Sequence, residues 1–312
     1  MKKNHALILL LILTAVIITY LITDLINSPQ KTGKKKDFTV VSSEVPTDSW
    51  YVHLTHQTEI QGLKAVAICN NGNIAAGGDS FIILYDKNFR ILWQKKTGGT
   101  VTALDSRDKI IFAALRDRLD LYDLSGNYIE TWGPFMPDGY ITSVASNKNY
   151  IVIADAANKS VFILNNEGAT AGIIGTGDER FIVPSLFFDT YIDNENNIYI
   201  ANTGMKRIEK HHVNGNIVSW IGESGNSPAG FAGCCNPSHF TIHGNRYITA
   251  EKGINRIKIL DADGKLVEYV SGNNNFERGI PLDIAAGDEN IIYAANPADS
   301  KIYVFRRNMM EK

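Results

Sequence analysis

A short pattern that recurs six times limits what this chain can fold into more than any other feature. Each copy has two or three apolar residues, then alanine, then a variable and mostly polar residue. The copies occupy residues 74–77, 111–115, 152–155, 199–202, 248–251 and 293–296. Their spacing is roughly 40 to 50 residues, the period of a supersecondary unit repeated along a chain. The fold therefore has to stack six similar units.

A second feature follows each copy, where an apolar segment ends in a polar residue. These residues are Asp86, Asp123, Asn165, His212, Asp261 and Arg306, and in four copies glycine follows three residues later, at Gly126, Gly168, Gly215 and Gly264. Asp or Asn starts a type I turn, and glycine takes the left-handed φ that a bulged hairpin requires. Each unit therefore predicts four short antiparallel strands, which in the fifth unit span residues 239–243, 246–250, 256–261 and 265–270.

A four-stranded sheet of this size cannot bury both faces alone, whereas radial stacking covers each face with a neighbouring sheet. Beyond about residue 28 no apolar period of 3.6 is long enough for a domain helix, which disfavours Rossmann, TIM-barrel and helical-bundle folds. We predict an all-β, six-bladed β-propeller of four-stranded antiparallel blades. The six blades are expected at approximately residues 62–99, 100–139, 140–177, 182–227, 237–275, and 280–312 with 38–61.

The last unit supplies only three strands, and the segment around Trp50 is an unassigned strand. The other tryptophans, Trp93, Trp132 and Trp220, all lie on expected fourth strands. We therefore expect the Trp50 segment to complete the last blade and to close the ring, which removes an exposed sheet edge.

The N-terminus predicts a membrane anchor. Residues 6–23 carry no charge, and as a helix they span roughly 27 Å, close to the thickness of a bilayer core. Lys2 and Lys3 precede the segment, and no small-residue cleavage site follows it. We predict an uncleaved single-span helix within residues 1–23, with a removed signal peptide as the alternative, and a polar tether at 24–37. The domain at 38–312 is expected outside the cytoplasm, in a periplasm or on the cell surface.

The repeats resemble those of the NHL family, over about residues 62–307. The matching segments are residues 197–202 with Arg207 and Ile208, residues 250–257 with 260–264, and the connectors 181–184 and 231–237. The match is good in units 3 to 6 and weak in the first two, where Gly77 and Leu115 replace Asp or Asn. In the fourth unit His211 and His212 replace the usual apolar–Asp pair. The resemblance implies a propeller that binds through one face, without fixing a reaction.

Topology places the connectors between units, and the loops between second and third strands, on one face. The longer loops are on this face, at 132–140, 175–184, 222–237 and 272–281, and long loops on a rigid scaffold usually carry binding sites. The candidate ligand-binding residues there are Arg180, Cys234, Cys235, His239, Glu251, Lys252 and Arg278. Together they would suit an anionic or polar ligand, and a mixed, solvated surface is the alternative.

Cys234 and Cys235 are adjacent, which leaves three interpretations open: a strained vicinal disulfide, two plain thiols, or a metal-ligating pair. Cys69 is expected to be a buried apolar residue. Adjacent strand residues point to opposite sides, so His211 and His212 do not predict a shared metal. We therefore expect no metal or other cofactor.

Catalytic motifs of the nucleophile-elbow, Walker and zinc-protease types are absent from the sequence. The net charge of −2 argues against a nucleic-acid partner. The main hypothesis is a membrane-tethered, exported propeller that binds a protein, peptide or glycan without catalysis. The alternative is an enzyme at the channel mouth: a metal-dependent, lactonase-like hydrolase with acids such as Asp189, Asp283 or Glu251, or a thiol-redox activity at Cys234 and Cys235.

Overall fold

A computed structural model describes residues 13–20, 23, 51–177, 181–272 and 275–307. The chain divides into two compact units, Met1–Ser42 and Ser43–Lys312. In the first unit residues 13–20 are helical, and the Thr19 hydroxyl donates to the Ala15 carbonyl over 2.8 Å. Among the described residues, no helix is both long enough and apolar enough to span a membrane. Most of the predicted anchor and all of the predicted tether lie outside the described residues.

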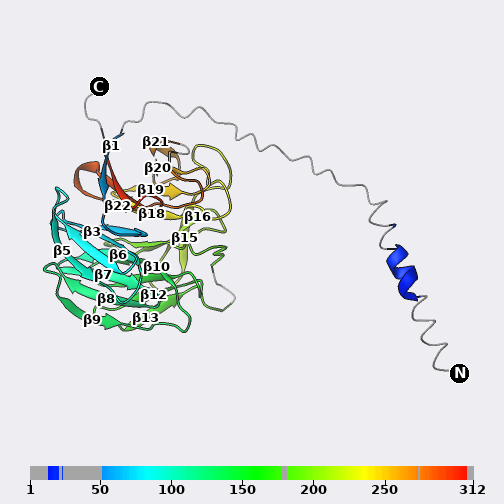
Figure 1. The fold of residues 1–312 in the computed structure, drawn as a ribbon, viewed down its shortest axis with the longest axis horizontal. Helices are drawn as coiled ribbons and strands as arrows, with labels where there is room; N and C mark the ends of the chain where they lie inside the picture. The colour runs from blue at the N-terminus through cyan, green and yellow to red at the C-terminus, as the bar shows by residue number, and fades with distance from the viewer. Residues whose placement is uncertain (1–12, 21–22, 24–50, 178–180, 273–274, 308–312) are drawn as a thin grey trace. The chain divides into compact units, whose positions relative to one another are not determined.

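The second unit contains six four-stranded antiparallel sheets (Figure 1). Blade 1 consists of β2 (Ala65–Ile68), β3 (Ile74–Gly78), β4 (Phe81–Tyr85) and β5 (Ile91–Lys96). Blade 2 consists of β6 (Val101–Arg107), β7 (Ile110–Leu115), β8 (Arg118–Asp123) and β9 (Tyr128–Trp132). Blade 3 consists of β10 (Ile141–Ser146), β11 (Ile151–Asp155), β12 (Ser160–Leu164) and β13 (Thr170–Ile174). Blade 4 consists of β14 (Thr190–Ile192), β15 (Ile198–Asn202), β16 (Arg207–His211) and β17 (Ile217–Ile221). Blade 5 consists of β18 (His239–His243), β19 (Arg246–Glu251), β20 (Arg256–Leu260) and β21 (Leu266–Ser271). Blade 6 consists of β22 (Asp283–Ala286), β23 (Ile292–Asn296), β24 (Lys301–Arg307) and β1 (Tyr51–Gln57).

The innermost strands form a closed ring. The first strand of each blade contacts the first strand of the next, and β22 contacts β2 to complete the circuit. The chain is therefore an all-β, six-bladed propeller, as the repeats predict. The four strands predicted for the fifth unit match the observed ones to within one residue at every end.

An N-terminal strand closes the last blade. β1 pairs antiparallel with β24, with Tyr51 opposite Arg307 and Gln57 opposite Lys301. Sheet order β1-β24-β23-β22 makes β1 the outermost strand, which is the predicted arrangement. Trp50 itself lies outside the described residues.

The core lies between blades. The second and third strands are buried almost throughout, whereas outer strands such as β5 and β9 are mostly exposed. One apolar cluster joins Ala154 and Val161 of blade 3 to Ile198 and Ile200 of blade 4, and all four are fully buried. Each of the larger aliphatic side chains, valine and isoleucine, contributes about 1.5–3 kcal/mol when it is buried. Each sheet therefore depends on its neighbours for its interior.

The predicted turns are present, and their glycines serve two purposes. Gly126 and Gly168 have φ values of +83° and +77°, and Gly126 N–H donates to the Asp123 carbonyl over 3.0 Å. A Cβ atom on Gly168 would lie 2.3 Å from the Trp132 ring of the preceding blade. Glycine is therefore required both by the turn conformation and by the packing of the next blade against the indole.

Candidate functional site

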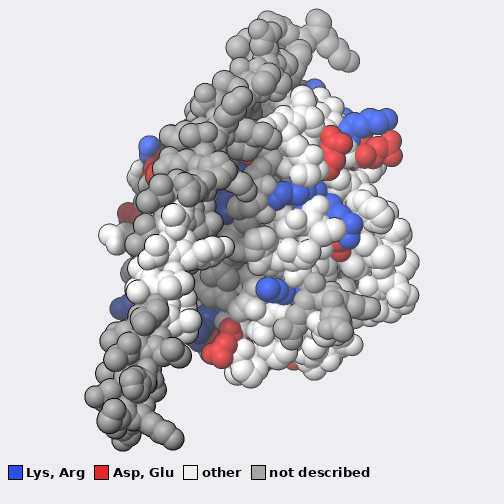
Figure 2. Space-filling model, turned by 90° about the vertical axis from the view of Figure 1, so that its right-hand side faces the viewer, with Lys and Arg blue, Asp and Glu red and all other residues white. Residues whose placement is uncertain are grey.

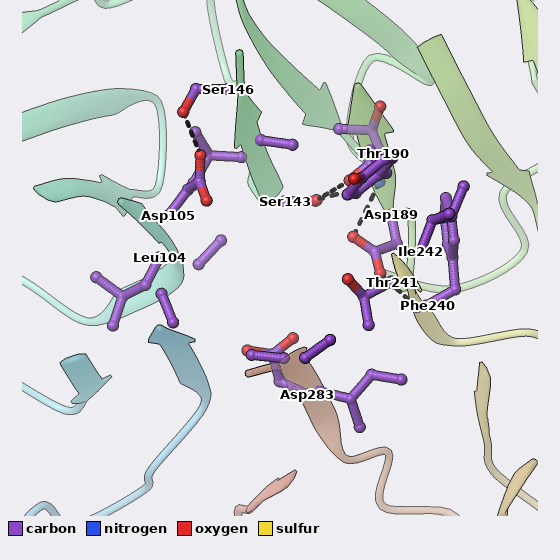
Figure 3. Close-up of a pocket in the computed structure, with 18 of the residues that line it drawn as sticks. Leu104, Asp105, Ser143, Ser146, Asp189, Thr190, Phe240, Thr241, Ile242 and Asp283 are labelled. Carbon is purple, nitrogen blue, oxygen red and sulfur yellow. Dashed lines mark hydrogen bonds between the residues drawn. The ribbon is translucent and has the colours of Figure 1, made fainter. Parts of the chain in front are cut away.

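The first strands line a central cavity of about 350 Å³, and Figure 3 shows three acidic side chains on its wall. Asp189 Oδ2 accepts the backbone N–H of Phe240 in the next blade over 2.7 Å. Asp283 Oδ2 accepts the backbone N–H of Val66, across the closure of the ring, over 2.8 Å. Both carboxylates therefore join adjacent blades at the channel. Each lies where a first strand begins, at the end of the channel where the connectors between blades arrive.

His239, the first residue of β18, lies between these two carboxylates. Its Nδ1 is 3.7 Å from Asp189 Oδ2 and 3.5 Å from Asp283 Oδ1. Burial alone would lower the pKa of His239, but the nearby carboxylates of Asp189 and Asp283 raise it overall. Burial raises the pKa of Asp283 to about 6, although the charge of His239 acts in the opposite direction.

A second cavity of about 390 Å³ lies over this group, and we call it the mouth pocket. Its lining comes from the connectors before the first strands and from loop residues nearby: Lys64, Thr102, Tyr140, Thr142, Leu186, Phe187, His239, Gly279, Ile280, Pro281 and Pro297. Thr142 lines both cavities, so the mouth pocket adjoins the channel. Leu186 is 50% exposed, which makes its side chain available to a ligand. The pocket thus combines an apolar rim with the ionisable side chains of Lys64, Tyr140 and His239, the last of which lies beside two carboxylates.

The opposite end of the channel carries Asp105, near the end of β6. The Ser146 hydroxyl donates to Asp105 Oδ2 over 2.5 Å. Burial nevertheless raises the pKa of Asp105 to about 6. Both ends of the channel therefore hold a carboxyl group that titrates well above the usual range of aspartate.

Of the predicted site residues, His239 alone lines the mouth pocket among those that the structure describes. Arg180 lies outside the described residues. Arg278 is exposed, and its guanidinium donates to the Gly253 carbonyl over 3.1 Å. Ligand binding by these two arginines stays a prediction.

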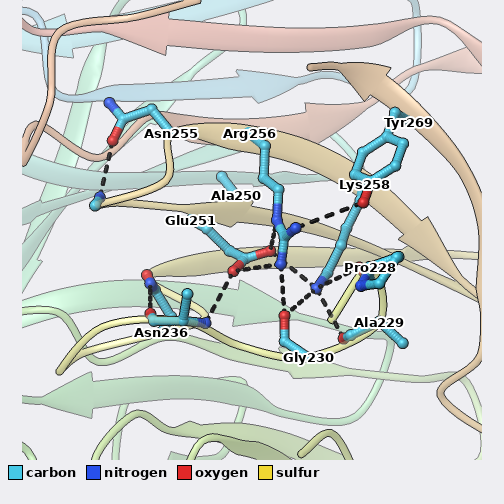
Figure 4. Close-up of polar contacts among 12 residues, drawn as sticks. Pro228, Ala229, Gly230, Asn236, Ala250, Glu251, Asn255, Arg256, Lys258 and Tyr269 are labelled. Carbon is cyan, nitrogen blue, oxygen red and sulfur yellow. Dashed lines mark hydrogen bonds and ion pairs between the residues drawn. The ribbon is translucent and has the colours of Figure 1, made fainter. Parts of the chain in front are cut away.

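Glu251 is buried in a cluster of charges instead of facing the channel (Figure 4). Its Oε1 accepts from Arg256 Nε over 2.7 Å and lies 2.9 Å from Lys258 Nζ. Both cations also donate to the Gly230 carbonyl, over 2.6 and 2.7 Å. All three side chains belong to the fifth blade, whereas Gly230 belongs to the 222–237 loop. The cluster therefore fastens this long loop to the blade below it.

Cys234 and Cys235 are free thiols in the structure, with their sulfur atoms 3.1 Å apart. Cys234 is exposed and Cys235 is buried. Lys252 is adjacent: its Nζ lies 4.2 Å from the centre of the Phe187 ring and 3.4 Å from the Ser185 hydroxyl. Phe187 lines the mouth pocket, and the Lys252 backbone N–H donates to Asn236, which directly follows the cysteines, so Lys252 contacts both regions.

The other expectations about single residues concern Cys69 and the histidine pair. Cys69 is buried, as predicted, directly after β2. His211 is also buried, and its ring nitrogens are 3.0 Å from Glu209 Oε2 and 3.0 Å from the Gly215 carbonyl. Among the described residues, no group of three or more His, Cys, Asp or Glu side chains is arranged to hold a metal ion. The hydrolase alternative depends on such a group.

Sequence reasoning did not identify the apolar rim of the mouth pocket. Leu186, Phe187 and Ile280 come from two separate connectors, and no local pattern shows that they converge. A usable signal exists for the acids, because Asp189 and Asp283 stand at equivalent positions at the start of two first strands. From the sequence, both acids enter only the hydrolase alternative.

Charged residues of both signs are scattered over the face of the molecule in Figure 2, among many uncharged residues. Over the visible described surface, positive and negative groups stand near one another.

Comparisons with known proteins support the fold. No protein-family model matches the sequence, and no curated protein does. A solved structure of streptogramin B lyase aligns over 83% of this chain and 99% of its own, with 13% identity and a TM-score of 0.58. A protein of unknown function from Bacteroides thetaiotaomicron aligns over 82% and 76%, with 13% identity and a TM-score of 0.61. The WD40 domain of Pan2 from Neurospora crassa aligns over 85% and 97%, with 10% identity and a TM-score of 0.58.

Identities this low show a shared fold and nothing about activity. The chain is a six-bladed β-propeller with a pocket at one end of its central channel.

Proposed function

We propose that this protein is a binding module that holds a protein or peptide ligand at the mouth pocket. The observation that carries the proposal is the pocket itself, in which exposed Leu186 and partly buried Phe187 stand beside His239. An apolar ligand side chain buried there would contribute about 1.5–3 kcal/mol. A glycan would make less use of this aliphatic rim.

His239 supplies the polar part of the recognition. Its Nδ1 faces Asp189 and Asp283, so its Nε2 is the nitrogen available to a ligand. A protonated imidazole is a charge-assisted donor, which suits a carbonyl or carboxylate oxygen of the ligand. The preferred ligand is therefore an apolar residue next to a hydrogen-bond acceptor.

We also propose that the propeller is exported and tethered to a membrane. The uncharged segment at residues 6–23 supports this, and the resemblance to NHL repeats supports binding through one face. The chain enters the propeller at Tyr51, on the face opposite the mouth pocket, because β1 runs antiparallel to β24. Membrane fractionation, followed by protease treatment of intact cells, tests the tether: full-length protein in the soluble fraction would contradict it.

The binding proposal is tested by panning a random peptide display library against the purified full-length protein. Enriched peptides should bind the wild-type protein and lose at least about tenfold in affinity for Leu186→Ser and His239→Gln. Ile129→Ser is the matched control, because Ile129 is 46% exposed on the outer strand β9, and it should bind normally. Absence of enrichment, or equal binding to all variants, would refute the mouth pocket as the site.

A further inference from the structure

The adjacent cysteines lie in a hydrogen-bonded loop with their sulfur atoms 3.1 Å apart. Asn236, which follows them, is fully buried and accepts the Lys252 backbone N–H over 2.9 Å. Its amide also donates to the carbonyls of Lys252, over 2.7 Å, and of Ala232. The segment that carries the thiols is thereby fixed to the loop after β19. The sulfur atoms are 3.1 Å apart, about 1 Å more than in a disulfide, and a bond between adjacent residues closes a strained ring.

The two thiols differ in access and in charge environment. Cys234 is exposed, whereas Cys235 is 1% exposed. The hydrogen bond with Cys235, together with the charges of Lys252 and Lys206, lowers the pKa of Cys234. Burial raises the pKa of Cys235. An accessible thiol that ionises readily next to a protected one is the arrangement of an attacking and a resolving cysteine.

We propose that Cys234 and Cys235 form a dithiol site that exchanges with low-molecular-weight disulfides, a role beyond ligand binding at the mouth pocket. Cys234 is the attacking residue because its sulfur is exposed. Cys235 is the resolving residue because its sulfur is buried against that of Cys234. Lys252 contacts both Asn236 of this loop and Phe187 of the mouth pocket, which places this chemistry near the proposed binding site.

The reaction proceeds in two balanced steps. The Cys234 thiolate attacks one sulfur of a disulfide RSSR, the S–S bond breaks, and one RS⁻ leaves while a mixed disulfide forms. Cys235 then loses its proton to solvent and attacks the Cys234 sulfur, which releases the second RS⁻ and closes a Cys234–Cys235 bond. The protein loses two electrons and two protons, and RSSR gains both electrons and becomes two thiols after protonation.

Oxidised glutathione is the probe for a test with the reduced, full-length protein. Samples are quenched in acid at intervals and analysed by mass spectrometry of the intact protein and its peptides. The wild-type protein should pass through a transient glutathione adduct at Cys234 and end with an intramolecular bond that lacks two hydrogen atoms. Cys69, which is 2% exposed, should stay unmodified and serves as the internal control.

Two serine variants assign the roles of the cysteines. Cys235→Ser should stop at a stable mixed disulfide, and Cys234→Ser should react at least about tenfold more slowly. Prior treatment of the wild-type protein with phenylarsine oxide, which requires two neighbouring thiols, should block both steps without any mutation. A lasting glutathione adduct on the wild-type protein, a disulfide between two molecules, or an unaltered rate in Cys234→Ser would each overturn the proposal.

The lysine environment provides a separate readout. Lys252→Gln should slow adduct formation at neutral pH several-fold, and the difference should fade above the pKa of the free thiol. Lys95→Gln, a change to an exposed lysine on the outer strand β5 of blade 1, is the control and should react like the wild-type protein. Equal rates for all three proteins at neutral pH would show that Lys252 does not activate Cys234.

Discussion

Replacing Glu251 by glutamine tests the charge cluster that fastens the 222–237 loop. The substitution keeps the size of the side chain and removes the only negative charge within salt-bridge distance of Arg256 and Lys258 among the described residues. All three side chains are 3% exposed or less. Two buried cations would then remain beside each other without a counter-charge.

The expected loss in the free energy of unfolding is about 3–5 kcal/mol, because removing one partner leaves buried charge uncompensated. The size of the loss should depend on pH. Burial lowers the pKa of Lys258 to about 8, and the charge of Glu251 acts to raise it. Without that carboxylate Lys258 releases its proton at a lower pH. The loss in the free energy of unfolding should therefore be largest near pH 6, where Lys258 still carries a charge, and should shrink as the pH rises towards 8.

Equilibrium urea unfolding, followed by tryptophan fluorescence at pH 6 and pH 8, measures both effects. Asp108→Asn is the matched control, because Asp108 is 79% exposed and lies 3.8 Å from Arg107 in a surface ion pair. That variant should stay within about 0.5 kcal/mol of the wild-type protein. If Glu251→Gln loses no more than Asp108→Asn at pH 6, the cluster does not stabilise the fold as argued.

Three further predictions concern the turns and the channel. Gly168→Ala should lower the free energy of unfolding in urea by about 2–4 kcal/mol. Gly72→Ala is the control, because Gly72 has a similar φ of +79° and no atom within 4 Å of a new Cβ, and it should cost only about 1 kcal/mol. Equal losses would rule out the contact with the Trp132 indole as the cause. The raised pKa of Asp105 stabilises the native state in acid, and this contribution is lost as the pH rises through 6. Asp105→Asn should therefore make the free energy of unfolding vary less with pH between about 4 and 6. Asp189→Asn should lower the pKa of His239 in an NMR titration. An unchanged pKa would show that Asp189 does not affect the ionisation of His239.

The fold was predictable because its determinants are local. The turn that begins at Asp123 and ends at Gly126 specifies a hairpin with a left-handed residue, and it recurs in register with the alternating strands. Ring closure followed from counting strands, and the pairing of Tyr51 with Arg307 bears this out.

The site was less predictable because it depends on how long loops fold. Glu251 ends a second strand on the predicted binding face, but the 222–237 loop covers it and supplies carbonyl groups to Arg256 and Lys258. Strand spacing does not encode that cover. His239 is predictable because it follows the cysteine pair closely at the end of the 222–237 loop. The position of Leu186 depends on how its connector folds, which no local pattern specifies.

The strand that closes the ring also receives any pull applied to the N-terminal segment. β1 spans seven residues and is paired with β24 along its whole length. Ladder hydrogen bonds run perpendicular to the strands, so tension directed along β1 acts on all the pairs at once, in shear. A force directed away from the sheet at Tyr51 would separate them one after another. The same seam that seals the propeller therefore makes its mechanical resistance depend on the direction of the load.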